Sequence, residues 1–324
     1  MRIVVTGGAG FIGSNFVRHA VQGAYPALTG ADVVVLDKLT YAGRKENLTS
    51  VLDNPSLRFV EGDICDAPLM RDVLRDSDLV VHIAAESHVD RSISGAEEFV
   101  RTNVLGTQTL LTAALAAGVG KFVHVSTDEV YGSLDAEGTP WTEEAPLSPN
   151  SPYAASKASS DLMALAFQRT HGLPVCVTRG SNTYGPYQYP EKIIPLFVSR
   201  LLAGQQVPLY GDGTHVRDWL HVDDHCQGIA LVAAGGEPGE VYNVGGGTEL
   251  TNRALTGRLL DLLGKDTSMV ERVTDRKGHD RRYAMDISKI SGALGYKPAV
   301  PFDDGLAATV DWYRQHHGLW ADGA

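Results

Sequence analysis

The chain has 324 residues, of which 43% are hydrophobic and 21% charged, and its formal net charge is −11. A chain of this size can bury a full core and exceeds one mononucleotide-binding fold, so we expect one main domain and a smaller additional part. The acidic balance argues against nucleic acid or an anionic membrane as the main partner. Cys65, Cys176 and Cys226 form neither a Cys-x-x-Cys pair nor a metal-binding spacing. Their spacing predicts no metal site and suits a reducing compartment. Because the sequence shows no signal peptide and no long apolar run, we expect a cytoplasmic protein.

The first segment predicts a nucleotide-binding loop. Arg2–Thr6 is a β-branched run, and Ser14–Gln22 is typical of a helix. The glycine-rich segment between them allows a tight turn, close approach to a pyrophosphate and close packing of helix on strand, while the helix N-terminus faces the phosphate charge. Such a motif alone is weak, but here it follows a strand and opens a helix. The residues predicted to bind a dinucleotide are Gly7, Gly10, Phe11, Ile12 and Gly13.

The next two strands refine the type of dinucleotide. The strand over Asp32–Asp37 ends in an acid at about the distance at which a carboxylate binds the adenosine ribose, which favours NAD over NADP. Lys38 could instead receive a 2′-phosphate, and this alternative stays open. The run Leu57–Ile64 predicts a third strand that places Asp63 where it could accept from the adenine amino group. Asp63 could equally cap the helix predicted over Ala67–Arg75.

Strand-like runs alternate with helical stretches up to about residue 178, and this rhythm predicts an α/β fold with a doubly wound parallel sheet, a Rossmann fold. Further strands are predicted over residues 79–83, 122–125 and 175–178, and helices over Glu97–Ala117 and Tyr153–His171. Beyond Gly185 the chain is less regular, with helices over 193–203 and 252–263 and a returning strand over 240–244. We therefore expect an NAD-binding domain over 1–178, with a returning segment near 216–247, and a smaller mixed substrate-binding domain over 179–324.

Polar side chains follow three predicted strands directly. They are Ala84-Ala85-Glu86-Ser87-His88 after the fourth strand, Thr127-Asp128-Glu129 after the fifth and Ser181-Asn182-Thr183 after the sixth. Because ligands bind beyond the carboxyl ends of parallel strands, these groups predict one shared site. His88 alone could also be an ordinary structural or surface histidine.

Two pairs of residues predict proton-transfer chemistry. Tyr153 and Lys157 lie four residues apart on a predicted helix and share one face, so the ammonium is expected to lower the pKa of the phenol. Asp128 and Glu129 add two acid–base groups, and close carboxyl groups split their pKa values, so that one can act as acid and the other as base. Together these four acid–base groups indicate oxidation of a substrate hydroxyl followed by elimination. The alternative for Asp128 and Glu129 is a solvated acidic pair at the start of a loop. The alternative for Tyr153 and Lys157 is an ordinary exposed pair on a helix.

On these residues the chain resembles the extended short-chain dehydrogenase/reductases and, within that superfamily, the dTDP-glucose 4,6-dehydratases. Thr-Asp-Glu followed by Val-Tyr-Gly is typical of the dehydratases. The motifs that carry the resemblance are Thr6–Gly13, Ala84–Ser92, Asn103–Thr107, Ser126–Gly132, Ser151–Lys157, Tyr184–Gln188, Pro190–Pro195, Asp212–Trp219 and Gly278–Arg282. One segment departs from the pattern: Gly180-Ser181-Asn182-Thr183 stands where relatives commonly carry Cys-Ser-Asn-Asn.

The resemblance implies a bound, regenerated NAD, dTDP-glucose as substrate, and loss of water across C5 and C6 of the sugar. It implies that Tyr153, with Lys157, takes the C4 hydroxyl proton beside Thr127, that Glu129 takes the C5 proton and that Asp128 protonates the leaving C6 hydroxyl. The implied cofactor contacts are Gly7, Gly10, Phe11, Ile12, Gly13, Asp37, Lys38, Leu39, Thr40, Asp63, Ile64, Ala84, Ala85, Glu86, Ser87, Thr102, Tyr153, Lys157 and Thr183. The implied substrate contacts are Ser87, His88, Thr127, Asn182, Lys192, Ile193, Pro208, Leu209, Tyr210, Arg217, Asn252, Thr274, Asp275, Arg276, Lys277 and Gly278.

Several alternatives stay open. A 4-epimerase or decarboxylase of the superfamily would share the fold, NAD and the Tyr-Lys pair without needing the Asp-Glu pair. A GDP-mannose-type dehydratase would act on another nucleotide, and a dinucleotide-sensing protein would bind without turnover. Arg217 could hold a diphosphate bidentately or simply pair with Asp218 or Asp212. The helices over 97–117 and 153–171 are expected to form a homodimer, although their alanines could equally pack on their own sheet.

Overall fold

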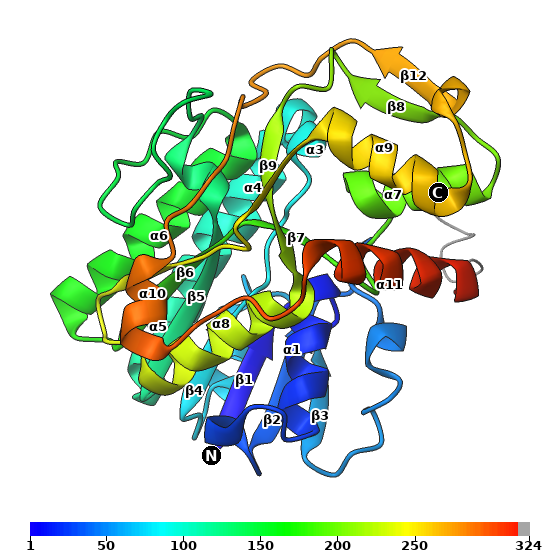
Figure 1. Ribbon diagram of the computed structural model, residues 1–324. Coiled ribbons are helices and arrows are strands. Elements are labelled where there is room, and N and C mark those ends of the chain that lie inside the picture. The colour runs from blue at the N-terminus through cyan, green and yellow to red at the C-terminus, as the bar shows by residue number, and fades with distance from the viewer. Residues whose placement is uncertain (317–324) are drawn as a thin grey trace.

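The computed structural model describes residues 1–316, and its largest element is a parallel sheet of seven strands in the order β10-β6-β5-β4-β1-β2-β3 (Figure 1). Both faces of this sheet are covered, which explains why its strands are nearly continuous apolar runs. The prediction of a doubly wound parallel sheet is confirmed. The strands are β1 (Arg2–Thr6), β2 (Asp32–Asp37), β3 (Leu57–Glu61), β4 (Leu79–His82), β5 (Lys121–Thr127), β6 (Val175–Gly180) and β10 (Val241–Val244).

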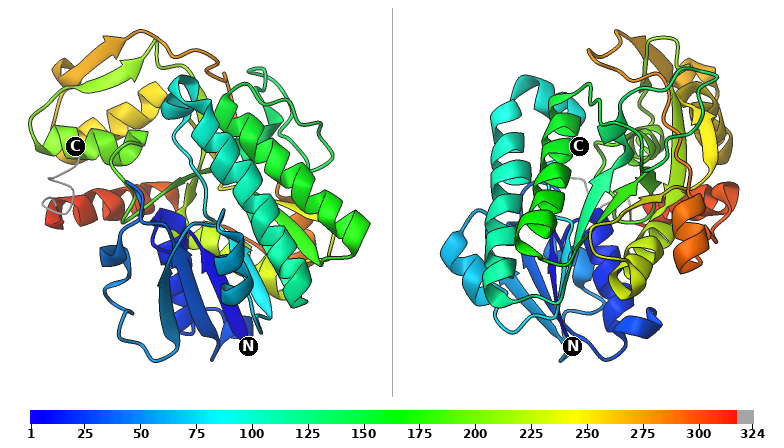
Figure 2. Two further views of the ribbon diagram at one scale, coloured as in Figure 1. Left: turned by 180° about the vertical axis from the view of Figure 1, so that it is seen from behind. Right: turned by 90° about the vertical axis from the view of Figure 1, so that its left-hand side faces the viewer.

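Two layers of helices enclose the sheet. On one face lie α1 (Phe11–Val21), α8 (Val222–Gly235) and α10 (Ser288–Leu294), whose Phe16, Ile229 and Ile290 are fully buried in one core. On the other face lie α2 (Ala67–Val73), α5 (Thr107–Ala117) and α6 (Pro152–His171), which bury Met70, Leu110 and Ala164 in a second core. Figure 2 shows α5 and α6 side by side on the outside of this second face.

The connection from β4 to β5 differs from the single helix predicted over 97–117. It consists of α3 (Val89–Ser94), α4 (Ala96–Phe99), the π-helix η3 (Val100–Gly106) and then α5. The π-helix contains the buried Asn103, and the Thr107 hydroxyl donates to the Asn103 carbonyl at 2.6 Å. Such wide turns inside helices are frequent at functional sites, and side-chain periodicity did not indicate this one.

The remaining elements form a smaller part above the carboxyl ends of the main sheet (Figure 1). A three-stranded sheet orders β11-β9-β7, and a parallel pair joins β8 to β12. These elements are β7 (Asn182–Tyr184), β8 (Val207–Tyr210), β9 (Val216–His221), β11 (Thr248–Thr251), β12 (Val270–Val273), α7 (Ile193–Leu202), α9 (Asn252–Leu263) and α11 (Phe302–Gln315), with the short 3-10 turn η5 (Thr267–Met269). Three further 3-10 turns, η1 (Pro26–Leu28), η2 (Lys45–Leu48) and η4 (Asp128–Tyr131), connect elements of the main sheet.

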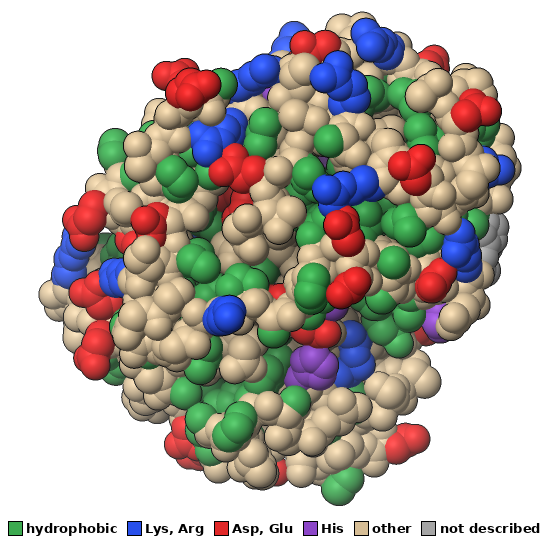
Figure 3. Space-filling model, viewed as in Figure 1, with side chains coloured by type: hydrophobic (Ala, Val, Ile, Leu, Met, Phe, Trp, Pro, Cys, Tyr) green, Lys and Arg blue, Asp and Glu red, His purple; other side chains and the backbone are tan. Residues whose placement is uncertain are grey.

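The chain crosses between the two parts more than once. Strand β10 pairs with β6 in parallel, with Val244 opposite Gly180, so the predicted return of residues 240–244 to the main sheet is correct. Helices α8 and α11 were not predicted. Among residues 1–316, no helix has the length and apolarity needed to cross a membrane. On the face seen in Figure 3, acidic side chains are interspersed with Lys and Arg.

Candidate active site

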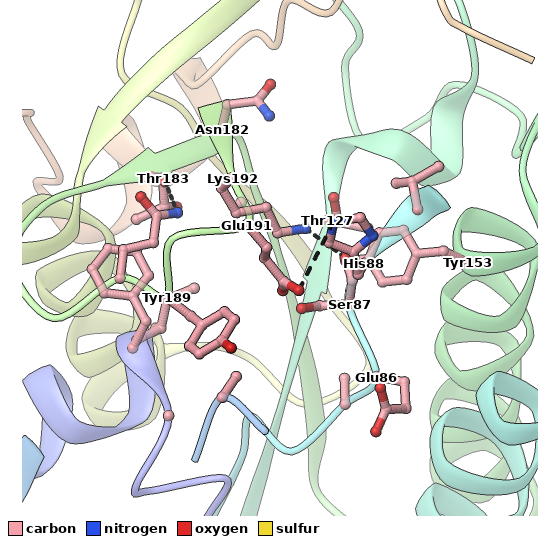
Figure 4. A pocket seen from close by; sticks show the side chains of 18 of the residues that line it. Glu86, Ser87, His88, Thr127, Tyr153, Asn182, Thr183, Tyr189, Glu191 and Lys192 are labelled. Atoms are coloured by element: carbon pink, nitrogen blue, oxygen red, sulfur yellow. Dashed lines mark hydrogen bonds and ion pairs between the residues drawn. The ribbon is translucent and has the colours of Figure 1, made fainter. Parts of the chain in front are cut away.

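A cavity of about 630 Å³ lies beyond the carboxyl ends of the main sheet, beneath the smaller part. The structure brings all three predicted strand-end groups to this cavity, together with the glycine loop (Figure 4). Nearly all residues predicted to bind cofactor or substrate line it. The exceptions are Leu39, Thr274, Asp275, Lys277 and Gly278.

The glycine loop has the shape that a dinucleotide pyrophosphate requires. Gly7 has a φ of +68°, and a Cβ at Gly13 would lie only 2.0 Å from the Gly7 carbonyl oxygen. Helix α1 starts with no side-chain cap, and Gly10, Phe11 and Ile12 line the cavity at its N-terminus. The first amide groups of a helix favour an anion, so this loop can hold a phosphate group.

The residues after β2 favour a ribose with a free 2′-hydroxyl. Asp37 accepts from the amides of Ala9 at 2.9 Å and Leu39 at 2.8 Å, and burial raises the pKa of this carboxyl. Each carboxylate oxygen can accept a further bond from a hydroxyl group. Lys38 pairs with Asp63 at 2.9 Å, an ion pair that a 2′-phosphate bound to this lysine would have to compete with.

Asp63 is not the helix cap that was weighed as its alternative role. Asp66 caps α2, because its side chain accepts from the Leu69 amide. Asp63 accepts from the Cys65 amide at 2.9 Å and from Lys38. Burial alone would raise the pKa of Asp63, but these hydrogen bonds outweigh it and lower the pKa.

Asp128 and Glu129 are not a solvated pair. Asp128 is 2% exposed, and burial together with the charge of Glu129 raises its pKa well above the usual range. Burial also raises the pKa of Glu129, but Arg276, Lys192 and Arg217 oppose that shift. The cations therefore favour an ionised Glu129, while Asp128 is held as the neutral acid.

The Tyr153–Lys157 pair differs from its expected electrostatics. Lys157 donates to the Val125 carbonyl oxygen at 2.8 Å, and burial lowers its pKa to about 8. Burial and the charge of Glu129 raise the pKa of Tyr153, although a hydrogen bond with Thr127 opposes the shift. The phenol pKa is therefore shifted in the direction opposite to the one expected, because desolvation and a nearby carboxylate dominate its surroundings.

The loop after β4 is held by a residue to which the sequence assigned no role. Asn103 accepts from the Glu86 amide at 2.9 Å and donates to the Glu86 carbonyl at 3.0 Å and to the Ser156 hydroxyl at 2.8 Å. It thereby ties the cavity wall to helix α6, which carries Tyr153. The Asn103–Thr107 motif was noted, but only the fold brings this amide to the loop.

The substrate side of the cavity contains the buried cation Arg217. Arg217 is 5% exposed, lies 4.3 Å from the Tyr283 ring centroid and donates to the Val216 carbonyl. Asp218, the suggested partner of Arg217, instead accepts from the amides of Gly246 and Thr248. Within residues 1–316, Nη2 of Arg217 and Oδ1 of Asn182 are buried without hydrogen-bond partners, which suits binding of a polar ligand.

Glu191 joins the two sides of the cavity and was also missed. Its carboxylate accepts from the Tyr41 hydroxyl at 3.1 Å and lies 3.8 Å from His88 Nε2. Figure 4 shows Glu191 and its neighbour Lys192 projecting toward the loop after β4, where the lysine ammonium donates to the Ser87 carbonyl at 2.6 Å. Glu191 lies within the Pro-Glu-Lys motif that the sequence singled out. Its role could not be predicted because its partners are distant in sequence.

The segment after β12 contributes less than expected. Thr274, Asp275, Lys277 and Gly278 are exposed and do not line the cavity, because this extended loop turns only some side chains inward. Arg276 and His279 do line it.

No metal site was predicted, yet three potential ligands meet at the same loop. The His215, Asp275 and His279 ligand atoms lie within 4.8 Å of one another. The two imidazoles are stacked, with centroids 3.6 Å apart and an interplanar angle of 14°. Because the two rings are nearly parallel, the lone pairs of their nitrogen atoms do not converge on one point. Oδ1 of Asp275 lies 2.6 Å from Nδ1 of His279, within hydrogen-bonding distance.

A doubly wound nucleotide-binding sheet with a Tyr-Lys pair beside its glycine loop defines the class, the extended short-chain dehydrogenase/reductases. The family model described as GDP-mannose 4,6 dehydratase matches residues 4–309. A dTDP-glucose 4,6-dehydratase of Streptomyces antibioticus is 60% identical over 321 residues, covering 99% of this chain and 94% of the relative. The chain therefore belongs to the dTDP-glucose 4,6-dehydratase family.

Solved structures agree with this assignment. The dTDP-glucose 4,6-dehydratase DesIV of Streptomyces venezuelae, with NAD and dTDP bound, is 63% identical and has a TM-score of 0.98, with 99% of each chain covered. The enzyme of Bacillus anthracis in complex with NAD is 48% identical with a TM-score of 0.91, covering 99% of this chain and 98% of that one.

Proposed function

We propose that the protein converts dTDP-glucose into dTDP-4-keto-6-deoxyglucose and water. The observation that carries this function is the Asp128–Glu129 pair, with Asp128 buried and Glu129 partly buried, in the same cavity as Tyr153 and Lys157. A 4-epimerase needs to move a proton only at the C4 hydroxyl, whereas elimination across C5 and C6 needs a base and an acid in addition. Family membership at 60% identity supports the same reaction.

NAD is the cofactor, and the residues present fit it. The glycine loop would hold the pyrophosphate and Asp37 the adenosine ribose, while Asp63 already pairs with Lys38, the lysine that could receive a 2′-phosphate. When bound, NAD⁺ supplies the acceptor and later the donor of the hydride that leaves C4 and returns to C6.

The chain's own residues perform the proton steps. For Tyr153 to take the C4 hydroxyl proton, its phenol must first lose its own proton, which the positive charge of Lys157 favours; Thr127 positions the C4 oxygen. The 4-ketone acidifies the C5 proton, which passes to Glu129. Asp128, kept neutral by burial, gives its proton to the C6 hydroxyl, so that the C6–O bond breaks and water leaves. Glu129 then gives its proton back to C5, and the proton that Tyr153 took from the C4 hydroxyl replaces, through solvent, the one that Asp128 lost, so that all three groups regain their starting state.

The nucleotide part of the substrate is assigned to the smaller part of the fold. Arg217, whose Nη2 is buried without a hydrogen-bond partner within the described chain, would bind the diphosphate, and Asn182 would join it through its side-chain N–H. Lys192, Ile193, Pro208, Leu209, Tyr210, Asn252 and Arg276 would surround the nucleoside. We accordingly divide the chain into an NAD-binding part over 1–178 with returning segments and a mainly substrate-binding part over 179–324, of which 317–324 lie outside the described residues.

A homodimer is the proposed assembly. Leu105 and Val100 on η3 are 52% and 56% exposed, and Leu162 on the adjacent α6 is 61% exposed, so the two helices share an apolar outer face. Exposed apolar faces of this kind are typical of contacts between subunits. Ala113 and Ala114, by contrast, pack into their own sheet. The three free cysteines support the cytoplasm as the location.

The test is incubation of purified protein with dTDP-glucose labelled with deuterium at C4, without added reductant. The expected product has lost one water and carries the deuterium at C6, with no net reduction of the cofactor. An unchanged mass with formation of the galactose epimer would instead identify an epimerase. Turnover of GDP-mannose but not of dTDP-glucose would overturn the nucleotide assignment.

A further inference from the structure

The two departures from the dehydratase pattern, at residues 180 and 183, meet at one side chain, His225 of α8. A Cβ at Gly180 would lie 2.4 Å from Cε1 and 2.5 Å from Nε2 of His225, so the imidazole fills the space where a side chain would begin. Gly180 is the last residue of β6 and is paired with Thr127 at the end of β5. The imidazole edge therefore lies next to the strand ends that carry the proposed chemistry.

Thr183 decides which nitrogen of His225 carries the proton. The Thr183 hydroxyl donates to the Ser181 carbonyl oxygen at 3.0 Å, which uses its single proton. His225 Nδ1 lies 2.8 Å from the same hydroxyl oxygen and must be the donor in that contact. Burial lowers the pKa of His225 to about 4, so the ring is neutral at physiological pH. Nε2 is consequently an unprotonated acceptor.

This acceptor lacks a partner from the protein. Within residues 1–316, Nε2 of His225 is buried without a hydrogen bond, and the imidazole lines the cavity. A buried acceptor left unsatisfied costs free energy, so a ligand donor is favoured there. The proposed cofactor has such a donor, the amide N–H of its nicotinamide carboxamide, and its ring must lie near Tyr153 for hydride transfer.

We propose that His225 is a cofactor-binding residue whose Nε2 accepts a hydrogen bond from the nicotinamide carboxamide. The inference rests on the proposed NAD-dependent function. Gly180 gives the imidazole its space, and Thr183 fixes its tautomer. A carboxamide held in this way has one rotational state, which fixes the face of the nicotinamide that is turned toward the sugar.

A cofactor analogue tests the hydrogen bond directly. In 3-acetylpyridine adenine dinucleotide a methyl ketone replaces the carboxamide, so the N–H donor is missing. The full-length protein should bind NAD about three- to tenfold more tightly than the analogue, the range for one neutral hydrogen bond. His225→Phe should bind both equally, and His225→Gln, whose carbonyl can accept, should keep part of the preference.

An equal preference for NAD in the wild-type protein and His225→Phe would overturn this inference alone. A wild-type protein that binds NAD at no concentration would overturn the proposed function as well.

The tautomer gives a readout independent of activity and affinity. In protein labelled with ¹⁵N-histidine, NMR should show His225 protonated at Nδ1 and bare at Nε2, with the Nε2 resonance shifting when NAD is added. Thr183→Val removes the hydroxyl at nearly constant volume and should abolish the fixed tautomer, whereas Thr183→Ser should retain it. A protonated Nε2, or one that NAD leaves unchanged, would contradict the proposal.

Discussion

The ammonium of Lys157 donates to the carbonyl oxygen of Val125 at 2.8 Å, and this contact anchors helix α6 to the end of β5. Helix α6 carries Tyr153, and β5 leads directly into Thr127, Asp128 and Glu129. One buried hydrogen bond thus holds the proposed C4 base and the proposed elimination groups in register. Because Lys157 lies in this interior position, its protonation is coupled to the stability of the fold as well as to the chemistry.

Removal of the Lys157 charge should change how stability depends on pH. Burial lowers the pKa of Lys157 from 10.5 to about 8, so between these values the unfolded chain holds a proton that the folded chain has released. The free energy of unfolding therefore gains a contribution that rises with pH across this window. Urea unfolding of the wild-type protein and Lys157→Met from pH 7 to pH 10 should show that the variant lacks this rise. Parallel curves for the two proteins would contradict the buried ammonium.

The two carboxyl groups should be separable by isotope exchange. Glu129→Gln removes the proposed C5 base, so solvent deuterium should no longer enter C5, and turnover should fall by about 10²–10⁴-fold. Asp128→Asn retains that base but lacks the acid, so C5 exchange should continue while loss of water fails. NMR of the sugar measures deuterium entry at C5, and the product mass measures the loss of water. Glu144→Gln, at an exposed acid just after Glu143, is the control and should behave as wild type. Identical defects in both site variants would contradict separate roles.

The ion pair beneath α6 should be important for stability. Asp161 Oδ2 lies 2.9 Å from Arg179 Nε with both side chains buried, and Arg179 also donates to the Tyr131 hydroxyl at 2.8 Å. Asp161→Asn leaves a buried guanidinium without its counter-charge, which should lower the free energy of unfolding by about 3–5 kcal/mol. Asp72→Asn breaks an exposed pair with Arg75 and should change it by less than about 1 kcal/mol. Denaturant titration distinguishes the two, and equal losses would contradict this account.

Two glycines should respond oppositely to alanine. At Gly13 a Cβ would lie 2.0 Å from the Gly7 carbonyl oxygen, so Gly13→Ala should distort the loop and abolish measurable NAD binding in a titration. Gly257 lies inside α9, where an added Cβ would meet no atom within 4 Å, so Gly257→Ala should raise stability by up to about 1 kcal/mol through helix propensity. Normal NAD affinity in Gly13→Ala would show that the loop does not bind the pyrophosphate.

A charge on the outer face of α6 should separate the proposed dimer. Leu162 is 61% exposed, and Leu162→Glu would place a charge within the subunit contact. Light scattering should give a dimer mass for the wild-type protein and a monomer mass for the variant, with unchanged circular dichroism. Leu262→Glu on α9, where the leucine is 37% exposed, is the control and should remain dimeric. A wild-type protein of monomer mass would remove the proposal.

Features encoded by local spacing could be predicted from the sequence. The strand, glycine loop and helix at the N-terminus follow from residues within one short segment, and so do the Tyr153–Lys157 helix pair and the Asp128–Glu129 pair at a strand end. Helix α9 begins and ends where the sequence predicts, and α7 ends one residue earlier. These signals are local because backbone propensity and side-chain periodicity act over a few residues.

The protonation states and distant contacts were decided only by the tertiary structure. The sequence alone determined a dinucleotide-binding α/β fold and the chemical groups that gather at its strand ends. Burial raises the pKa of Tyr153 against the prediction, Glu191 reaches Tyr41 across 150 positions, and His225 fills the space beside Gly180. Desolvation and contacts between distant segments depend on which elements pack together, and no spacing along the chain encodes that arrangement.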